Sequence, residues 1–417
     1  LRFKDLLDVS FIKMNFYRSS KYFSKINCHI GPPPFVYYIH IVLTFMQLIS
    51  PSFVLNSTII WKSDSLVSFV FQIFFAVSRG WHSGSDDFPR RVITIVCFFF
   101  ILLFDLLLEY FKHRFQYRQI LSDIESKTII SIYKYIIPHL YPFLLCGFPG
   151  AVINIINGDN SFLNYFDVIF GPLFFIYEVF KYFNITKRVL FENNPSFSMN
   201  SIFLPLTITI ISINNLIDCC IIPSEKSTFR IILLSILFII YLISGIFHMI
   251  LIPYVSQVYS YLFTSVCLSC SVTVLISIIC INLNVSIQYF LIVIFVILTI
   301  VFYFINLFIT HNSIIKYARI FEEMSNFPDC ANEKFDFYFK NKLSFYRSIQ
   351  ISLISWDPYF LSWKPFRLAY EKWPESELIL IIWAKIVSIF PQESNLFDQI
   401  TKKIIQNQKI SLNYRLQ

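Results

Sequence analysis

Charged side chains are scarce in this sequence. Asp, Glu, Lys and Arg make up 14 % of its 417 residues, whereas about a quarter of a typical soluble domain is charged. Apolar residues make up 56 %, and the mean hydropathy is +0.62. A soluble chain of this length would form two or three domains under a charged surface. The composition therefore excludes an ordinary soluble protein and is typical of a membrane protein.

Glycine is scarce too, with eight residues in the chain. A loop that cradles phosphate needs several glycines close together, and a serine nucleophile elbow needs the pattern Gly-x-Ser-x-Gly. Neither pattern occurs in the sequence, and there is no cluster of histidines. We therefore expect no catalytic site and no cofactor site in these residues.

The nine cysteines do not form a metal-binding pattern. Cys267-Leu-Ser-Cys270 has the spacing of a zinc knuckle, but no second pair and no nearby histidine accompanies it. Most of the cysteines lie in apolar runs, where Cys behaves as a small hydrophobic residue. The sequence therefore predicts no metal site.

Long apolar runs, by contrast, are abundant. A membrane-spanning helix needs about 20 mainly apolar residues. Six runs meet this requirement, namely 35–55, 92–111, 202–222, 231–252, 261–282 and 287–310. Two weaker runs, 129–153 and 162–180, bring the predicted number of spans to eight. The expected fold is all-α, a polytopic helical membrane bundle.

The two weaker runs contain charged residues and prolines. The first carries Lys134, Pro138, His139 and Pro142, and the second carries Asp167, Glu178 and the Gly171-Pro172 step. Because lipid disfavours such residues, we expect both runs to face other helices. A further apolar run, 66–78, has only 13 residues and is predicted to be a re-entrant or interfacial helix.

Positive charge predicts the orientation, because short cytosolic loops are enriched in Lys and Arg. With eight spans, the inner segments 1–34, 112–128 and 181–200 hold thirteen Lys and Arg residues, against six in the outer segments. If 66–78 also crossed, the balance would be eleven against eight, and the tail with fourteen more would lie outside. We therefore predict cytosolic termini, with the plasma membrane favoured over internal membranes.

This orientation places two glycosylation sequons outside, at Asn56 and Asn284, and one inside, at Asn184. Asn284 is only a few residues from the predicted spans on both sides. Any glycosidase-sensitive shift in mass should therefore come from Asn56 or Asn284.

Ionisable residues inside the spans are the natural candidates for sensing or transport. Asp105 and Glu109 lie one turn apart on one helix face. Lys134 lies about as deep in the next span as Asp105 does in its own, so an Asp105–Lys134 pair is geometrically feasible. The alternative is that all three side chains reach out to the nearby cytosolic surface.

Two more pairs of polar residues share helix faces. Asp167 and Glu178 are three helical turns apart, and Asn214 and Asp218 are one turn apart in the following span. Together these side chains would line a polar path of the kind that a channel or carrier requires. The alternative is that they hydrogen-bond between helices.

Two familiar channel signatures are missing. No span repeats Arg or Lys at every third position, and no TVGYG-like filter occurs, which argues against voltage gating and against a potassium channel. The histidines of the spans, His139 and His248, are expected to be packed or hydrogen-bonded rather than to relay protons.

The segment 311–417 differs from the rest, because polar residues return and apolar residues become periodic. Helical stripes are formed by Trp363, Phe366, Tyr370 and Trp373, by Leu378, Ile382, Ile386 and Ile389, and by Leu396, Ile400 and Ile404. Pro374 and Pro391 each open a helix, 17 residues apart, which is half of the 34-residue tetratricopeptide period. Ala369 and Ala384 suit close helix crossings.

The predicted domains are thus a basic N-terminal segment (1–34), a transmembrane domain (35–310) and a cytosolic helical tail (311–417). The tail would hold about one and a half tetratricopeptide-like repeats, whereas at least three are usually needed. Its fourteen Lys and Arg against eleven Asp and Glu make an ordinary mixed surface, so no nucleic-acid partner is expected. Because residue 1 is Leu, we expect the true start to lie upstream.

Three segments carry a resemblance to a known group. They are Gln47-Leu-Ile-Ser-Pro-Ser-Phe53 with Trp61, the apolar Val70-Phe-Gln-Ile-Phe-Phe75, and the tail pattern from Trp383 to Phe390-Pro391. They resemble large multi-pass protist membrane proteins, tiny macrocysts-like proteins among them. In that group helical repeats follow the membrane region, and many members add a PAS domain and an adenylate/guanylate cyclase domain.

The resemblance implies a receptor-like or scaffold role in cyclic-nucleotide signalling, with catalysis outside these residues. No cyclase carboxylate can be assigned, because no segment here matches a cyclase domain. We expect a sensor or receptor-like membrane region, with the lipid bilayer and a cytosolic signalling partner of the tail as its partners. The alternatives are an ion channel or small-solute transporter, and a non-catalytic scaffold or gene fragment. The ligand and the oligomeric state are not predicted.

Overall fold

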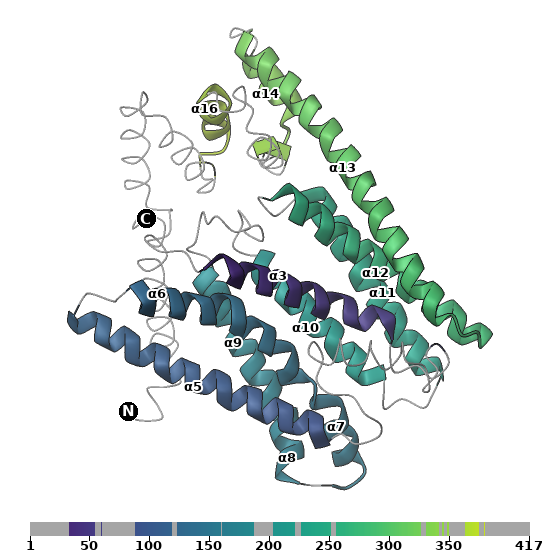
Figure 1. Cartoon of the computed structure of the whole chain (residues 1–417). Helices are drawn as coiled ribbons and strands as arrows, with labels where there is room; N and C mark the ends of the chain where they lie inside the picture. The colour runs from purple at the N-terminus through teal and green to yellow at the C-terminus, as the bar shows by residue number, and fades with distance from the viewer. Residues whose placement is uncertain are drawn as a thin grey trace. The chain divides into compact units, whose positions relative to one another are not determined.

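The computed structural model describes a chain that is helical in all its regular elements (Figure 1). The residues it describes are 33–54, 60, 88–118, 123–159, 161–186, 203–221, 227–251, 256–326, 331–341, 344–345, 348–349, 363–374 and 379. None of these residues forms a strand. The expected all-α class is therefore confirmed for this part of the chain.

The chain divides into two compact units, which are treated separately. The first, called the bundle unit below, comprises residues 1–250 and 258–304, and the second, called the tail unit, comprises 251–257 and 305–417. The helix α13 (Gln288–Asn326) contributes residues to both.

Among the residues that the structure describes, eight helical segments are long and apolar enough to cross a membrane, in agreement with the eight predicted spans. They are Phe35–Phe53, Val92–Phe111, Lys127–Ile156, Phe162–Phe183, Phe203–Ile221, Thr228–Leu251, Val258–Leu283 and Tyr289–Met324. Single α-helices carry five of them: α5 (Phe88–Arg118), α10 (Phe203–Ile221), α11 (Ser227–Leu251), α12 (Gln257–Leu283) and α13. The first joins α3 (Pro34–Ile49) to the 3-10 turn η1 (Ser50–Phe53). The run 66–78 lies outside the described residues.

The third and fourth spans depart from regular α geometry. The third runs through α6 (Asp123–Ile130), a π-helix η2 (Ser131–Ile136), a 3-10 helix η3 (Ile137–Leu145) and α7 (Phe148–Ile156). The fourth runs through α8 (Phe162–Tyr165), a π-helix η4 (Phe166–Phe170) and α9 (Gly171–Thr186). Pro138 and Pro142 lack the N–H that an α-helix interior needs, which accounts for the 3-10 stretch.

The expectation that both irregular spans face other helices is right for one of them. Most of the third span is buried in the bundle, with η3 between α5, α9 and α10. The fourth span buries one face only, and its Leu173, Ile176 and Phe180 are exposed. Its charged residues therefore point inward while its apolar residues point outward.

Across the bundle unit, as in the fourth span, apolar side chains are exposed and polar side chains are buried. Leu106 on α5 and Ile239 on α11 are exposed, whereas Asn214 on α10 and Ser265 on α12 are fully buried. Large exposed apolar surface is unfavourable in water and is what lipid requires. The distribution of side chains therefore supports the interpretation of these helices as membrane spans.

Two glycines mark close helix approaches in the bundle unit. A Cβ on Gly171 would lie 2.6 Å from the backbone oxygen of Leu144, and one on Gly245 would lie 2.7 Å from Cδ2 of Leu268. Both distances are shorter than van der Waals contacts allow, so an added Cβ would force the Leu144 backbone to shift at Gly171 and the Leu268 side chain to shift at Gly245.

The sequon at Asn284 lies in a tight connection between α12 and α13. Asn284 has φ 53°, the left-handed region that Asn tolerates better than most residues. The Ser286 hydroxyl of the same sequon donates to the backbone oxygen of Ile60 at 3.0 Å. Asn184 lies within α9, and Asn56 lies outside the described residues.

The tail unit is built around aromatic side chains. Its elements are the end of α13, α14 (Ala331–Tyr338) and α16 (Trp363–Lys372). Phe335 and Phe345 lie with ring centroids 5.5 Å apart, and Trp373 packs against both. Lys372 forms an ion pair with Asp336 across α14 and α16.

The first predicted stripe of the tail is helical, as expected. α16 begins at Trp363, and Phe366 and Ala369 on it are buried. The predicted second and third stripes lie outside the described residues. The tetratricopeptide-like arrangement of the tail therefore stays a prediction.

Candidate functional site

One lysine joins two carboxylates inside the bundle unit. Lys181 on α9 forms an ion pair with Asp105 on α5, and its Nζ lies 3.1 Å from Oε1 and 3.2 Å from Oε2 of Glu178. The exposed fractions of the three side chains are 8 % for Lys181, 18 % for Asp105 and 0 % for Glu178. We call these three residues the charge cluster.

Tyrosine hydroxyls from the third span complete the charge cluster. The hydroxyl of Tyr133 on η2 donates to Oδ1 of Asp105 at 2.5 Å, and that of Tyr141 on η3 donates to Oε2 of Glu178 at 3.3 Å. The Lys181 ammonium lies 5.0 Å from the centroid of the Tyr133 ring, within the range of a cation–π interaction. Each charge is thus compensated by more than one neighbour, as burial requires.

The charge cluster holds one cation and two carboxylates. Removing ions from water costs on the order of several kcal/mol each, and only close pairing with added hydrogen bonds offsets the cost. If both carboxylates are ionised, the group carries one net negative charge inside the bundle. It can therefore accept one further positive charge, such as a proton.

The structure pairs Asp105 with Lys181, whereas the sequence makes a pair with Lys134 feasible and leaves contact with the cytosolic surface as the alternative. Lys134 is buried on η2, with its Nζ 5.7 Å from the Tyr135 ring centroid. The sequence-based pairing assumes regular α geometry for the third span, whereas Lys134 lies in a π-helix. Glu109 is exposed on α5, so it does not share the buried environment of Asp105.

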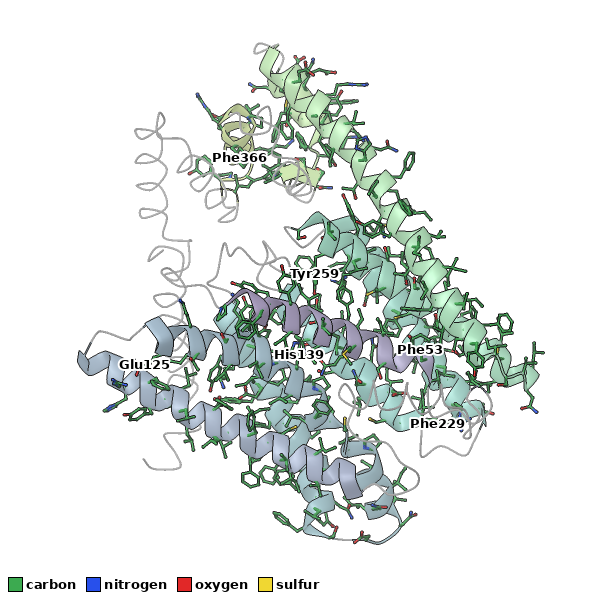
Figure 2. All side chains as sticks on the ribbon, in the orientation of Figure 1. Phe53, Glu125, His139, Phe229, Tyr259 and Phe366 are labelled. Carbon is green, nitrogen blue, oxygen red and sulfur yellow. The ribbon has the colours of Figure 1, made fainter. Side chains whose placement is uncertain are left out.

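A second polar cluster joins the first and third spans. His40 Nδ1 on α3 lies 2.8 Å from His139 Nε2 on η3, and His139 Nδ1 lies 2.9 Å from Oε1 of Gln47. Gln47 Nε2 donates to the backbone oxygen of His139 at 2.8 Å. All three side chains are buried (Figure 2 labels His139). His139 is therefore hydrogen-bonded, as expected.

The residues of the predicted polar path lie in different surroundings. Asn214 and Asp218 are both buried on α10. Asp167 is buried on η4 close to Gly147, where a Cβ would lie 2.6 Å from its Oδ2. Glu178 belongs to the charge cluster instead. The four side chains are all buried, but they are spread over three elements, and a continuous path through them stays a prediction.

Several residues that form these polar contacts could not be identified from the sequence. Lys181 falls in a predicted loop, although its position three residues after Glu178 is a usable signal for an ion pair on one helix face. Tyr133 and Tyr141 are two of 24 tyrosines, with nothing local to distinguish them. Asn215, whose Nδ2 donates to the backbone oxygen of Gln47 at 3.2 Å, likewise lacks a signal.

The described residues contain no group of three or more His, Cys, Asp or Glu arranged to hold a metal ion. Cys267 and Cys270 are buried in α12 with free thiols. His40 and His139 provide two nitrogens that are already hydrogen-bonded to each other. The arrangement suits charge compensation between helices rather than metal binding.

No protein-family model, curated protein or solved structure matches this chain. The resemblance to tiny macrocysts-like proteins therefore stays a prediction.

Proposed function

We propose that this chain is the sensor or receptor-like membrane region of a signalling protein, with no catalysis in these residues. The observation that carries the proposal is the continuity of α13, a single helix of 39 residues from Gln288 to Asn326. It begins in apolar sequence and ends in charged sequence around Arg319 and Glu323. A helix is stiff, so a shift at one end displaces the other.

The charge cluster is the proposed switch of the bundle. Its partners come from α5, from α9 and from the third span, so a change of charge there alters packing between three elements. Ionisable residues inside a membrane bundle are expensive to bury and are candidates for function by default.

The test substitutes a residue of the charge cluster and measures whether the tail unit responds. The full chain in lipid nanodiscs is compared with Glu178→Gln by amide hydrogen exchange, and the matched control is Glu109→Gln, at an exposed carboxylate on α5. We expect Glu178→Gln, and not the control Glu109→Gln, to change amide hydrogen exchange in α14 and α16. Three glycines inserted after Asn312 should abolish that response, because glycine weakens helix continuity. An unchanged tail alongside an altered bundle would contradict the proposal.

The proposal includes an orientation. Both termini face the cytosol in the plasma membrane, and the tail is a set of tetratricopeptide-like helices that binds a cytosolic partner, in keeping with the resemblance to proteins of cyclic-nucleotide signalling. The excess of Lys and Arg in the inner segments supports it. The test is glycosidase treatment of the expressed chain: a shift lost in Asn56→Gln or Asn284→Gln agrees with it, and modification at Asn184 overturns the topology.

A transporter is the second candidate, and the charge cluster favours it. Two carboxylates share one lysine, so with both carboxylates ionised one negative charge is left for a transported proton or monovalent cation to neutralise. Proteoliposomes with a pH-sensitive dye or a sodium or potassium gradient would measure the flux. A transporter should show flux that Asp105→Asn removes and Glu109→Gln preserves. Flux equal to that of empty vesicles excludes it.

A further inference from the structure

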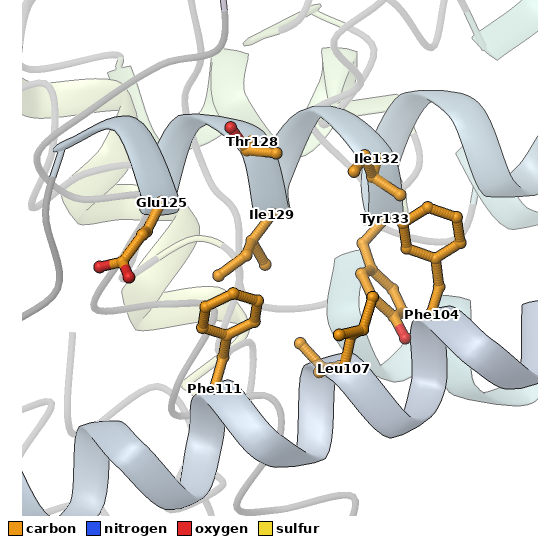
Figure 3. Close-up of a pocket in the computed structure, with 9 residues that line it drawn as sticks. Phe104, Leu107, Phe111, Glu125, Thr128, Ile129, Ile132 and Tyr133 are labelled. Atoms are coloured by element: carbon orange, nitrogen blue, oxygen red, sulfur yellow. The ribbon is translucent and has the colours of Figure 1, made fainter.

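A groove runs between the second and third spans on the bundle unit. Its volume is about 270 Å³, and it is lined by Phe104, Leu107 and Phe111 of α5 and by Ile129, Ile132 and Tyr133 of α6 and η2 (Figure 3). Glu125 also lines it, one helical turn before Ile129. The lining is therefore apolar along its length, with a carboxylate at one end and a phenol at the other.

The charged end of the groove carries an ion pair. Arg114, three residues after Phe111 on α5, pairs with Glu125, and the two side chains are 35 % and 25 % exposed. Arg114 and Glu125 lie just beyond the apolar segments Val92–Phe111 and Lys127–Ile156. In a bilayer this end would lie at the level of the headgroups, and the apolar part would lie beside the acyl chains.

We propose that this groove binds one acyl chain of a zwitterionic phospholipid, with the headgroup at the Arg114–Glu125 pair. The apolar lining fits a hydrocarbon chain, and its volume is below that of pockets for drug-sized molecules, which run from about 300 to 1,000 Å³. A guanidinium has five N–H donors and a carboxylate several acceptor sites. Arg114 can therefore bind the phosphate and Glu125 the ammonium while the two stay paired.

The far end of the groove reaches the charge cluster. The ring of Tyr133 lines the groove, while its hydroxyl donates to Asp105 at 2.5 Å. A lipid chain in the groove therefore contacts a residue that holds the charge cluster. That this contact is the stimulus rests on the proposed function, whereas binding of the lipid does not.

The first experiment counts retained lipid. The full chain is purified in mild detergent with phosphatidylethanolamine, and native mass spectrometry measures its occupancy. Leu107→Trp fills the groove, and the matched control Leu106→Trp changes an exposed neighbour on the same helix that does not line it. We expect Leu107→Trp to retain less lipid than Leu106→Trp, because the indole occupies space of the acyl chain and removes its contacts with the groove. Equal retention by both variants overturns the inference.

The second experiment keeps the wild-type residues and so does not depend on how the variants fold. Phosphatidylethanolamine with a photoreactive group in its acyl chain is cross-linked in nanodiscs and mapped by peptide. Cross-links concentrated in 104–111 and 125–133 support the groove, and cross-links spread over all exposed helix faces overturn it.

The headgroup is tested with two charge variants. Glu125→Gln should weaken the binding of phosphatidylethanolamine, and it should leave the binding of phosphatidylglycerol unchanged or make it tighter. Arg114→Gln should weaken the binding of both lipids. Tighter binding of phosphatidylglycerol than of phosphatidylethanolamine to the unchanged chain overturns the zwitterionic assignment. Lipid retention without any tail response to Glu178→Gln would contradict the proposed function and leave this inference standing.

Discussion

At the scale of single residues, Lys181 connects α9 to α5 and to the third span, although the sequence did not single it out. It bonds Asp105 of α5 and Glu178 of its own helix, and its ammonium lies over the Tyr133 ring. The two carboxylates repel each other, so their burial depends on the lysine between them. The free energy of the cluster is therefore sensitive to the charge at this position.

Lys181→Met should destabilise the bundle by about 3–5 kcal/mol, the usual cost of leaving a buried charge without its partner. Lys181→Arg keeps the charge and should cost less. Thermal and detergent-induced unfolding of the purified chain would measure both. Adding Asp105→Asn and Glu178→Gln to Lys181→Met should recover much of the loss, and a triple variant as unstable as Lys181→Met would show that packing, not charge, is responsible.

The hydrogen bonds of Gln47 predict a second effect at this scale. Gln47→Leu should destabilise the bundle by about 1–3 kcal/mol, because His139 loses a side-chain partner while it stays buried. Thr44→Val is the matched control, since the Thr44 hydroxyl donates to the backbone oxygen of His40 one turn earlier on its own helix. Equal unfolding midpoints for the two variants would contradict a role of the His40–His139–Gln47 cluster in stability.

At the scale of helices, the response of a close crossing to substitution depends on which atoms lie next to its glycine. Gly171 meets a backbone oxygen, that of Leu144, which no substitution can remove. Gly245 meets mainly the side chain of Leu268, which a smaller residue can shorten. The two crossings should therefore respond differently to the same added methyl group.

Both Gly171→Ala and Gly245→Ala should destabilise the bundle, by about 1–3 kcal/mol each, as overpacking does. Leu268→Ala should rescue Gly245→Ala in part and should not rescue Gly171→Ala. A double-variant cycle on unfolding midpoints measures this coupling. Strict additivity of Gly245→Ala and Leu268→Ala would show that the two residues do not pack together in the membrane.

At the scale of the whole molecule, the described residues of the bundle unit bury polar side chains such as Asn214 and expose apolar ones such as Leu106, which is compatible with an integral membrane protein. This arrangement predicts which positions lipid touches. Ile239 on α11 is 49 % exposed and Leu237, two residues earlier, is 0 % exposed.

A fluorescent amino acid at Ile239 should be quenched strongly by brominated lipids, and one at Leu237 only weakly, because bromine quenches on contact. The measurement uses the full chain in vesicles. Equal quenching at the two positions would contradict the packing of α11, and quenching by a water-soluble agent at Ile239 would contradict its place in a membrane.

The sequence by itself determined the all-α class and the eight candidate spans in the part of the chain that the structure describes, because a run of about 20 apolar residues has the length of a membrane-spanning helix. Run length and composition are local quantities. The eight candidate spans and the helix beginning at Trp363 could therefore be predicted without knowledge of neighbours.

Which residues contact one another was decided by the tertiary structure alone. Asp105 pairs with a lysine 76 residues away, and the groove exists only because side chains of α5 and side chains of α6 and η2 line it together. Proline and π-helical geometry in the third span rotate its side chains away from ideal α positions. Since a contact between helices depends on the rotation of both, residue spacing within one run could not specify it.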